Sequence, residues 1–229
     1  ARSRTIRHIL LIHPPVAKAC EPPGGLARLA GCLKAHGVGC TVLDANLEGQ
    51  LRLLTEAAEP AGRNIDTWTA RACRRLPEHL AALRGPELYG NADRYRRCVN
   101  DVNRLLARRG REAGVSLTLA DYQDRRLSPL RTEDLLRAAR DYRSNPFVPG
   151  LAGRIEALVE ETPPDAVGLS LNYLSQALGA FALIGFIDVP ATHFHIPSRH
   201  MDFARLAPRD GVPVAGAGDG AGQDLAVSQ

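Results

Sequence analysis

The chain has 229 residues, which is enough for one large domain or for a domain with a sizeable insertion. Hydrophobic residues make up 45% of it and charged residues 24%, which are ordinary values for a globular protein, so a packed core is expected. The formal net charge is only +4, and the densest basic run has helical spacing with interspersed acids. We therefore interpret that run as a solvated helix face and expect no nucleic-acid partner.

The cysteines and the lack of long apolar runs indicate in which cellular compartment the protein is expected. The number of cysteines is odd, their spacings are irregular and no C-x-x-C occurs (Cys20, Cys32, Cys40, Cys73 and Cys98). This pattern predicts free thiols and a cytoplasmic protein. No apolar run reaches the roughly 18 residues of a membrane span, so no membrane partner is expected. The chain begins at Ala1 rather than at methionine, and we expect a fragment or a processed form.

Residues 1–46 predict a β-α-β unit. Residues 8–13 form a continuous apolar run that is typical of a buried parallel strand. Two proline pairs and two glycines follow, and residues 25–36 then place apolar side chains on one helix face before ending at Gly37. A second strand ends at Asp44. This order predicts an α/β fold, with a Rossmann-like or flavodoxin-like open parallel sheet.

The composition changes over residues 47–162, which are rich in arginine and poor in strand patterns. This predicts a long helical insertion between strands two and three. Four segments have helical periodicity: LEGQLRLLTEAA, TARACRRLPEHLAALRG, YRRCVNDVNRLLARRG and RTEDLLRAARDY. Residues 163–229 return to the α/β pattern and predict the second half of the domain. The expected elements there are a strand at 165–173, an apolar and largely buried helix at 176–187, a strand at 191–196, a short helix at 201–208 and a strand at 212–218.

The loops that follow the strands predict the binding site, because the carboxyl ends of parallel strands meet at one edge of an open sheet. The candidate ligand-binding residues are Pro14, Pro15, Gly24, Gly25, Asp44, Asn46, Ser170, Leu171, Asn172, Tyr173, Gly216 and Gly218. They supply backbone amides, small polar side chains and stiff apolar walls. None of them is an obvious base or nucleophile, so we assign no catalytic residue and expect a large, partly apolar ligand.

Simpler interpretations of the same residues stay open. The proline pairs could shape a rigid turn, and Ser170 and Asn172 could cap the helix that follows them. Asp44 could simply accept hydrogen bonds from backbone amides, and the glycines at 216 and 218 could form a plain turn. Three histidines, His193, His195 and His200, have a spacing that could bind zinc. Two partly buried strand histidines and one loop histidine are the favoured interpretation, and no metal ligand is assigned.

Three segments carry a resemblance to a known family: IHPPVAKACEPPGGLARLAGCLKAHGVGCTVLDANLEG, PPDAVGLSLNYLSQALGAFALIGFI and GVPVAGAGDGAGQDL. They are similar to the N-terminal cobalamin (B12)-binding domain of B12-dependent radical S-adenosylmethionine (SAM) proteins. The family opens with a strand, a Pro-Pro loop, a helix of the pattern PPxGLxxLAxxLKxxGH and a strand ending in Asp. A subgroup of it has a long helical insertion, which LYGNADRYRRCVNDVNRLL resembles.

The resemblance implies a corrinoid cofactor, held by the candidate residues above, and a radical SAM domain as its partner. In the family the corrinoid commonly serves methyl transfer, and the following domain carries an iron–sulfur cluster and S-adenosylmethionine. That cluster needs a cysteine triad of the type C-x-x-x-C-x-x-C, which this chain lacks. We therefore expect a chain truncated before the radical SAM domain and not catalytic by itself. His13 is a less favoured candidate as a ligand to cobalt.

Two segments depart from the family's pattern, and two alternative functions stay open. Where the family has a Gly-Gly pair after the fourth strand, the chain reads IPSRHM at 196–201. DANLEG at 44–49 matches the spacing of the D-x-H-x-x-G cobalamin motif with Asn46 in place of histidine. The first alternative is a degenerate Rossmann-like domain that acts as a protein-interaction module without bound corrinoid. The second is a nucleotide-using enzyme, against which the lack of G-x-G-x-x-G and G-x-x-x-x-G-K-[ST] argues.

Overall fold

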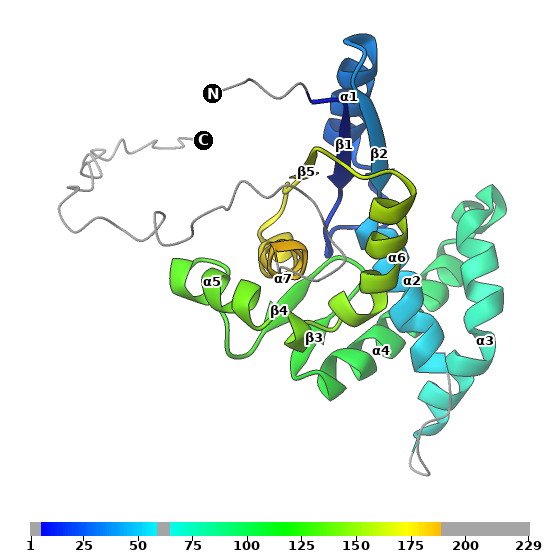
Figure 1. The fold of residues 1–229 in the computed structure, drawn as a ribbon. Coiled ribbons are helices and arrows are strands. Elements are labelled where there is room, and N and C mark those ends of the chain that lie inside the picture. Colours follow the sequence, from blue (N-terminus) through cyan, green and yellow to red (C-terminus); the bar gives the residue numbers. More distant parts are fainter. Residues whose placement is uncertain (1–5, 59–64, 189–229) are drawn as a thin grey trace, which may run out of the picture. The chain divides into compact units, whose positions relative to one another are not determined.

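A three-stranded parallel sheet of order β2-β1-β5 organises the fold (Figure 1). The computed structural model describes residues 6–58 and 65–188, all of them in the first of the two units, 1–199 and 200–229, into which the chain divides. β1 (His8–Ile12) lies between β2 (Gly39–Leu43) and β5 (Ala166–Leu169). The last residues of all three strands are in register, so the strands end level at one edge. The α/β class and the open parallel sheet are confirmed.

The two faces of the sheet bury separate apolar clusters. α1 (Gly24–Ala35) covers one face, where Leu11 packs with Leu26. Leu10 and Ile12 point to the other face and join the main core, which the later helices build. Successive side chains of a strand point to opposite faces, which produces this division. Figure 1 shows α1 beside β1 and β2, apart from the helices between β2 and β5.

Most of the chain between β2 and β5 is helical, as predicted. The helices are α2 (Ala45–Ala58), α3 (Thr67–Arg84), α4 (Ala92–Glu112), α5 (Thr132–Arg140) and α6 (Val148–Glu161), with 3-10 turns η1 (Pro86–Gly90) and η2 (Tyr142–Ser144). Asp66 caps α3 and Asn91 caps α4, because each side chain accepts hydrogen bonds from backbone N–H groups of the first turn. α6 is an additional helix, which no predicted segment covered.

A short antiparallel hairpin interrupts these helices. β3 (Val115–Leu117) pairs with β4 (Tyr122–Asp124) after α4 ends. The outer residues of β3 are buried and Ser116 is exposed, so the strand alternates as a half-buried strand should. Gly110 lets the hairpin approach α4, because an added Cβ there would lie 2.9 Å from the Val115 carbonyl oxygen. The sequence did not predict the hairpin, since three-residue strands are too short to show alternation.

The apolar helix α7 (Ala177–Asp188) follows the 3-10 turn η3 (Leu174–Gln176) and packs against α5 and α6. Its first four residues are buried, as are Ala182 and Leu183, which confirms the burial predicted for it. Gly179 faces the loop after β1, and Gly185 faces α5. α7 has 12 residues, and none of the helices in the described ranges combines the length and the apolar character that crossing a membrane requires.

Several sequence-based expectations fall after residue 188. The strand at 191–196, the helix at 201–208 and the strand at 212–218 lie outside the described residues. All five cysteines lie within them and are free thiols, as predicted, with two exposed and Cys98 buried.

Candidate functional site

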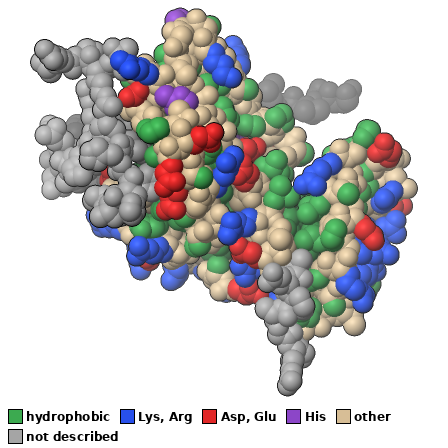
Figure 2. Space-filling model, turned by 45° about the vertical axis from the view of Figure 1, so that its right-hand side comes forward, with side chains coloured by type: hydrophobic (Ala, Val, Ile, Leu, Met, Phe, Trp, Pro, Cys, Tyr) green, Lys and Arg blue, Asp and Glu red, His purple; other side chains and the backbone are tan. Residues whose placement is uncertain are grey.

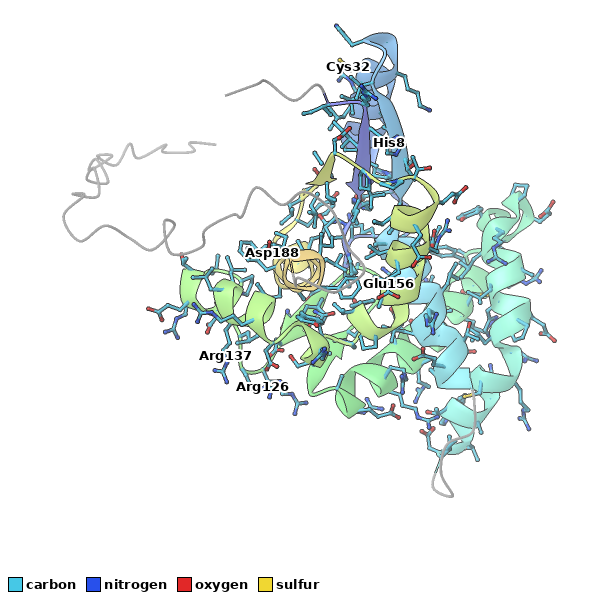
Figure 3. The ribbon with its side chains drawn as sticks, in the orientation of Figure 1. His8, Cys32, Arg126, Arg137, Glu156 and Asp188 are labelled. Atoms are coloured by element: carbon cyan, nitrogen blue, oxygen red, sulfur yellow. The ribbon has the colours of Figure 1, made fainter. Side chains whose placement is uncertain are left out.

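The level strand ends bring the loops after β1, β2 and β5 to one edge of the sheet. The His13 N–H donates to the Leu43 carbonyl oxygen (2.9 Å), and the Ser170 N–H donates to the Ile12 carbonyl oxygen (3.0 Å). The predicted convergence of the first three loops is therefore present. The opposite end of the sheet, where His8 begins β1 and Cys32 lies on α1, contributes no predicted residue (Figure 3).

The loop after β1 is buried, and Asn46 holds it in place. Pro14 and Pro15 are buried at its start. The Asn46 Oδ1 accepts hydrogen bonds from the Ala17 N–H (2.9 Å) and from Gln50 Nε2 (2.8 Å). The Asn46 side chain is 2% exposed and its oxygen has two partners, so this amide shapes the loop rather than facing a ligand.

Gln176, the last residue of η3, closes the same edge just before α7 begins. It is fully buried, and its Nε2 donates to the Pro14 carbonyl oxygen (2.7 Å). Its Oε1 accepts from the N–H groups of Asn172 (2.8 Å) and Tyr173 (3.1 Å). One side chain therefore joins the loops after β1 and β5. The sequence predicts Ser170 and Asn172 as possible helix caps and does not predict this role for Gln176. A lone amide just before an apolar helix is the signal that could have pointed to it.

The polar residues at the ends of β2 and β5 form hydrogen bonds mainly with backbone groups. The Asp44 Oδ1 accepts from the Leu47 N–H (2.9 Å) and so starts α2. This bears out the simpler interpretation of Asp44 as an acceptor for backbone amides. Ser170, which is half-buried, ties the end of β5 to β1 through its backbone N–H.

The outer rim of the edge is exposed and partly apolar. Leu171, Tyr173 and Leu174 have exposed fractions of 44%, 43% and 52%. Gly24 and Gly25 are exposed at the start of α1, and an added Cβ at either position would meet no atom within 4 Å. This rim offers apolar contact area and open backbone to a ligand.

A polar link crosses the rim. The Tyr173 hydroxyl donates to the Glu21 carboxylate, which also pairs with Lys18 at 2.8 Å. Lys18 and Tyr173 together lower the pKa of the Glu21 carboxyl. The link connects the loop after β5 to the loop after β1 on the exposed side.

His13 is the buried titratable residue of this edge. Its side chain is 2% exposed, and its Nε2 has no hydrogen-bond partner in the described part of the chain. Burial lowers the pKa of His13 below its usual 6.5, an effect that the nearby charge of Asp44 and an interaction with the Ser170 backbone oppose. The ring is therefore neutral at pH 7, and a neutral imidazole is the form that binds metals.

Acidification is expected to destabilise the protein through His13. The folded-state pKa lies below 6.5, so between these two values the unfolded chain binds more protons than the folded chain. The contribution of His13 to the free energy of unfolding is complete above pH 6.5, and it is lost as the pH falls toward the folded-state pKa. Urea unfolding at about pH 7.5 and about pH 5 should show a larger loss of stability for the wild type than for His13→Gln.

The matched control for this experiment is His36→Gln, which changes an exposed histidine just after α1. It should keep the full pH dependence of the wild type. An equal loss in wild type and His13→Gln would show that another group carries the effect.

The structure places most of the predicted ligand-binding residues at this edge. Its buried or half-buried part contains Pro14, Pro15, Asp44, Asn46 and Ser170, and its exposed rim contains Gly24, Gly25, Leu171, Asn172 and Tyr173. The remaining predicted residues lie outside the described residues, as do the alternative zinc ligands and the segment that departs from the family: Gly216, Gly218, His193, His195, His200 and 196–201.

Within the ranges that the structure describes, no three His, Cys, Asp or Glu side chains gather closely enough to hold a metal ion. Comparison with known proteins finds no match to this chain among protein-family models, among curated proteins or among solved structures.

Proposed function

We propose that the carboxyl edge of the sheet binds a corrinoid cofactor, in keeping with the resemblance of the sequence to cobalamin-binding domains. The single observation that carries the proposal is the Nε2 of His13, a buried polar atom without a partner at the end of the central strand. Buried polar groups are nearly always hydrogen-bonded, so an exception calls for an explanation. Ligation of cobalt by this nitrogen is such an explanation.

The rest of the edge fits a ligand of this kind. Leu171, Tyr173 and Leu174 present apolar surface to a large planar ring, and Gly24 and Gly25 leave room for close approach of a ligand to the backbone. His13 is 2% exposed, so ligation requires the residues that cover its ring to move aside. When bound, the corrinoid would supply a cobalt centre that carries a transferable methyl group.

The same proposal assigns the chain a partner. A corrinoid domain needs a second domain to generate the radical and to bind the substrate. We propose that a radical SAM domain, with its iron–sulfur cluster and S-adenosylmethionine, fills that role. The chain itself then binds and orients the corrinoid, and no step of radical chemistry takes place on its own residues.

The second candidate is a degenerate domain that binds a protein partner without corrinoid. Burial of the loop after β1 favours it, because Pro14, Pro15 and Gln176 fill the edge of the sheet with the chain's own side chains. The exposed apolar rim at Leu171 and Leu174 would then serve as contact surface for that partner. The two candidates differ in whether the purified chain takes up corrinoid.

Titration with hydroxocobalamin is the deciding experiment. We expect coloured protein after gel filtration, with a visible absorption band that shifts when an imidazole replaces water at cobalt. Replacing His13 by alanine should remove the band shift and weaken binding by about tenfold or more, as loss of interactions at a metal site does. His36→Ala, at an exposed histidine, is the control and should behave as the wild type.

Each alternative outcome has a distinct meaning. A folded wild-type protein that elutes colourless contradicts corrinoid binding and favours the protein-interaction candidate. Coloured protein whose spectrum and affinity are the same in His13→Ala would keep the cofactor but reject His13 as the cobalt ligand.

A further inference from the structure

A pocket of about 170 Å³ lies between α3 and α4, on a part of the fold that the corrinoid proposal does not use. It is lined from α3 by Arg71, Arg75, Glu78, His79 and Ala82, and from α4 by Arg94, Arg97 and Cys98. Residues three and four positions apart share one side of a helix, so each helix turns these side chains toward the other. Figure 2 shows Lys and Arg side chains gathered along the right-hand edge of the molecule.

The lining carries a strong excess of positive charge. Four arginines face one acid, Glu78. Arginine stays protonated under all ordinary conditions, so the pocket keeps this charge at any working pH. Like charges that line one pocket repel one another, and a bound anion would relieve that repulsion.

One wall of the pocket is an ordered chain of side chains. The Cys98 Sγ lies 3.2 Å from His79 Nδ1, and His79 Nε2 lies 2.9 Å from the Asp101 Oδ2. The carboxylate can only accept, so His79 donates to it and its ring is fixed between the two helices. Asp101 is thereby engaged with His79 and does not itself line the pocket.

The guanidinium groups of the pocket keep unused hydrogen-bonding capacity. The Arg71 Nε is buried and has no hydrogen-bond partner among the described residues, while its guanidinium lies over the Trp68 ring at 5.4 Å. No ion pair with a carboxylate is present for Arg71, Arg75, Arg94 or Arg97 in the part of the chain that the structure describes. The contrast is with Arg96, next in sequence to Arg97, which pairs with Asp93 at 3.7 Å.

We propose that this pocket binds a phosphate group, either as inorganic phosphate or as the phosphoryl group of a small monoester. A guanidinium presents its N–H donors as a planar fork that matches phosphate oxygens, and phosphate carries enough charge to balance several arginines. The small volume suits a single phosphate group rather than a whole nucleotide. This inference is independent of corrinoid binding, because none of these residues belongs to the edge of the sheet.

Isothermal titration calorimetry with inorganic phosphate tests the proposal. Chloride at equal ionic strength is the reference, because salt screens exposed charges and any anion would show that effect. We expect one phosphate per chain for the wild type. The double variant Arg75→Gln/Arg97→Gln should weaken binding by at least about tenfold, since charge-assisted hydrogen bonds are the strong ones. Both arginines are exposed, so the variant should fold, and its thermal unfolding is measured alongside.

The matched control is Arg74→Gln/Arg96→Gln, which makes the same change of charge at the neighbouring positions of the same two helices. Both residues are exposed, and neither lines the pocket. Weakening by less than about twofold is expected, because exposed ion pairs contribute little. An equal loss in both double variants would mean diffuse attraction and would overturn the proposal, as would no phosphate binding by the wild type.

Two further ligands distinguish the sources of the phosphate group. Tighter binding of glycerol phosphate than of inorganic phosphate would assign the pocket to a phosphomonoester, and the reverse order would assign it to the free ion. A short oligonucleotide that binds far more tightly than either, equally in both double variants, would place binding on the helix faces and contradict a pocket.

Discussion

Replacing Gly185 by alanine is expected to lower the free energy of unfolding by about 2 kcal/mol, because the new methyl group overpacks a closed helix contact. A Cβ at this position would clash with the Ala139 carbonyl oxygen and would lie 2.6 Å from its carbonyl carbon. These are backbone atoms of α5, which cannot rotate away as a side chain can. α5 and α7 must therefore separate, and the core that they share loosens.

The size of this effect is a balance of two opposing contributions. Overpacking of a core costs about 1–3 kcal/mol, and a clash with backbone falls at the upper end of that range. Alanine also gains roughly 1 kcal/mol over glycine inside a helix. Urea unfolding followed by circular dichroism gives the net change.

Gly153→Ala is the matched control, because Gly153 lies inside α6, is exposed and has no atom within 4 Å of an added Cβ. There only the helix contribution acts, so this variant should be more stable by up to about 1 kcal/mol. Opposite signs for the two variants are the expected result. A stabilised Gly185→Ala would mean that α5 and α7 do not approach as closely as the structure places them.

Replacing Gln176 by leucine is expected to destabilise the protein by about 3 kcal/mol, because buried hydrogen-bonding groups lose their partners. Leucine is of similar size, so the change removes polar contacts with little change in packing. The Pro14 carbonyl oxygen would lose its donor inside the protein, and the N–H groups of Asn172 and Tyr173 would lose their acceptor.

Hydrogen exchange gives this prediction a local test. Amide protection of Asn172 and Tyr173 should fall in Gln176→Leu more than the global loss of stability requires, since these are the groups set free. Asn172→Ala is the control: its side chain is exposed, and surface substitutions usually change stability by less than about 0.5 kcal/mol. Equal stability of Gln176→Leu and the wild type would show that Gln176 does not hold the two loops together.

Both predictions concern α7, which connects the sheet edge to the helical part of the chain. Gln176, the residue just before α7, ties down the loop after β1, and the far half of α7 carries Gly185 against α5. Gly179 makes a third close approach, since an added Cβ would clash with the Pro15 carbonyl oxygen. Changes along this one helix therefore reach the candidate corrinoid site and the core together.

The corrinoid and phosphate proposals place two ligands on different parts of one chain. The corrinoid site rests on the edge of the parallel sheet, and the phosphate site rests on two helices of the region between β2 and β5. His13→Ala and Arg75→Gln/Arg97→Gln each disable one site by design and should leave the other unchanged. Cross-testing each variant with the other ligand is thus an internal control for both.

Local patterns in the sequence predicted the elements that have long or regular signals. The apolar run of β1, the amphipathic pattern of α1 with its stop at Gly37, and the uniformly apolar α7 all appear close to their expected ranges. Gly37 has φ of +73°, a backbone conformation that glycine adopts without strain. The sequence does not predict α6, because Pro149, Gly150 and Gly153 interrupt its helical pattern.

The contents of the two sites could not be predicted in the same way. Gln176 and the Pro14 carbonyl oxygen are 162 positions apart, and His79 meets Cys98 and Asp101 from another helix. Hydrophobic periodicity is a property of neighbouring residues, so the sequence by itself determined the parallel α/β class, the helical region and the loops at the sheet edge. Which polar atoms pair and which stay unpartnered depends on how distant elements pack, and only the tertiary structure decided that.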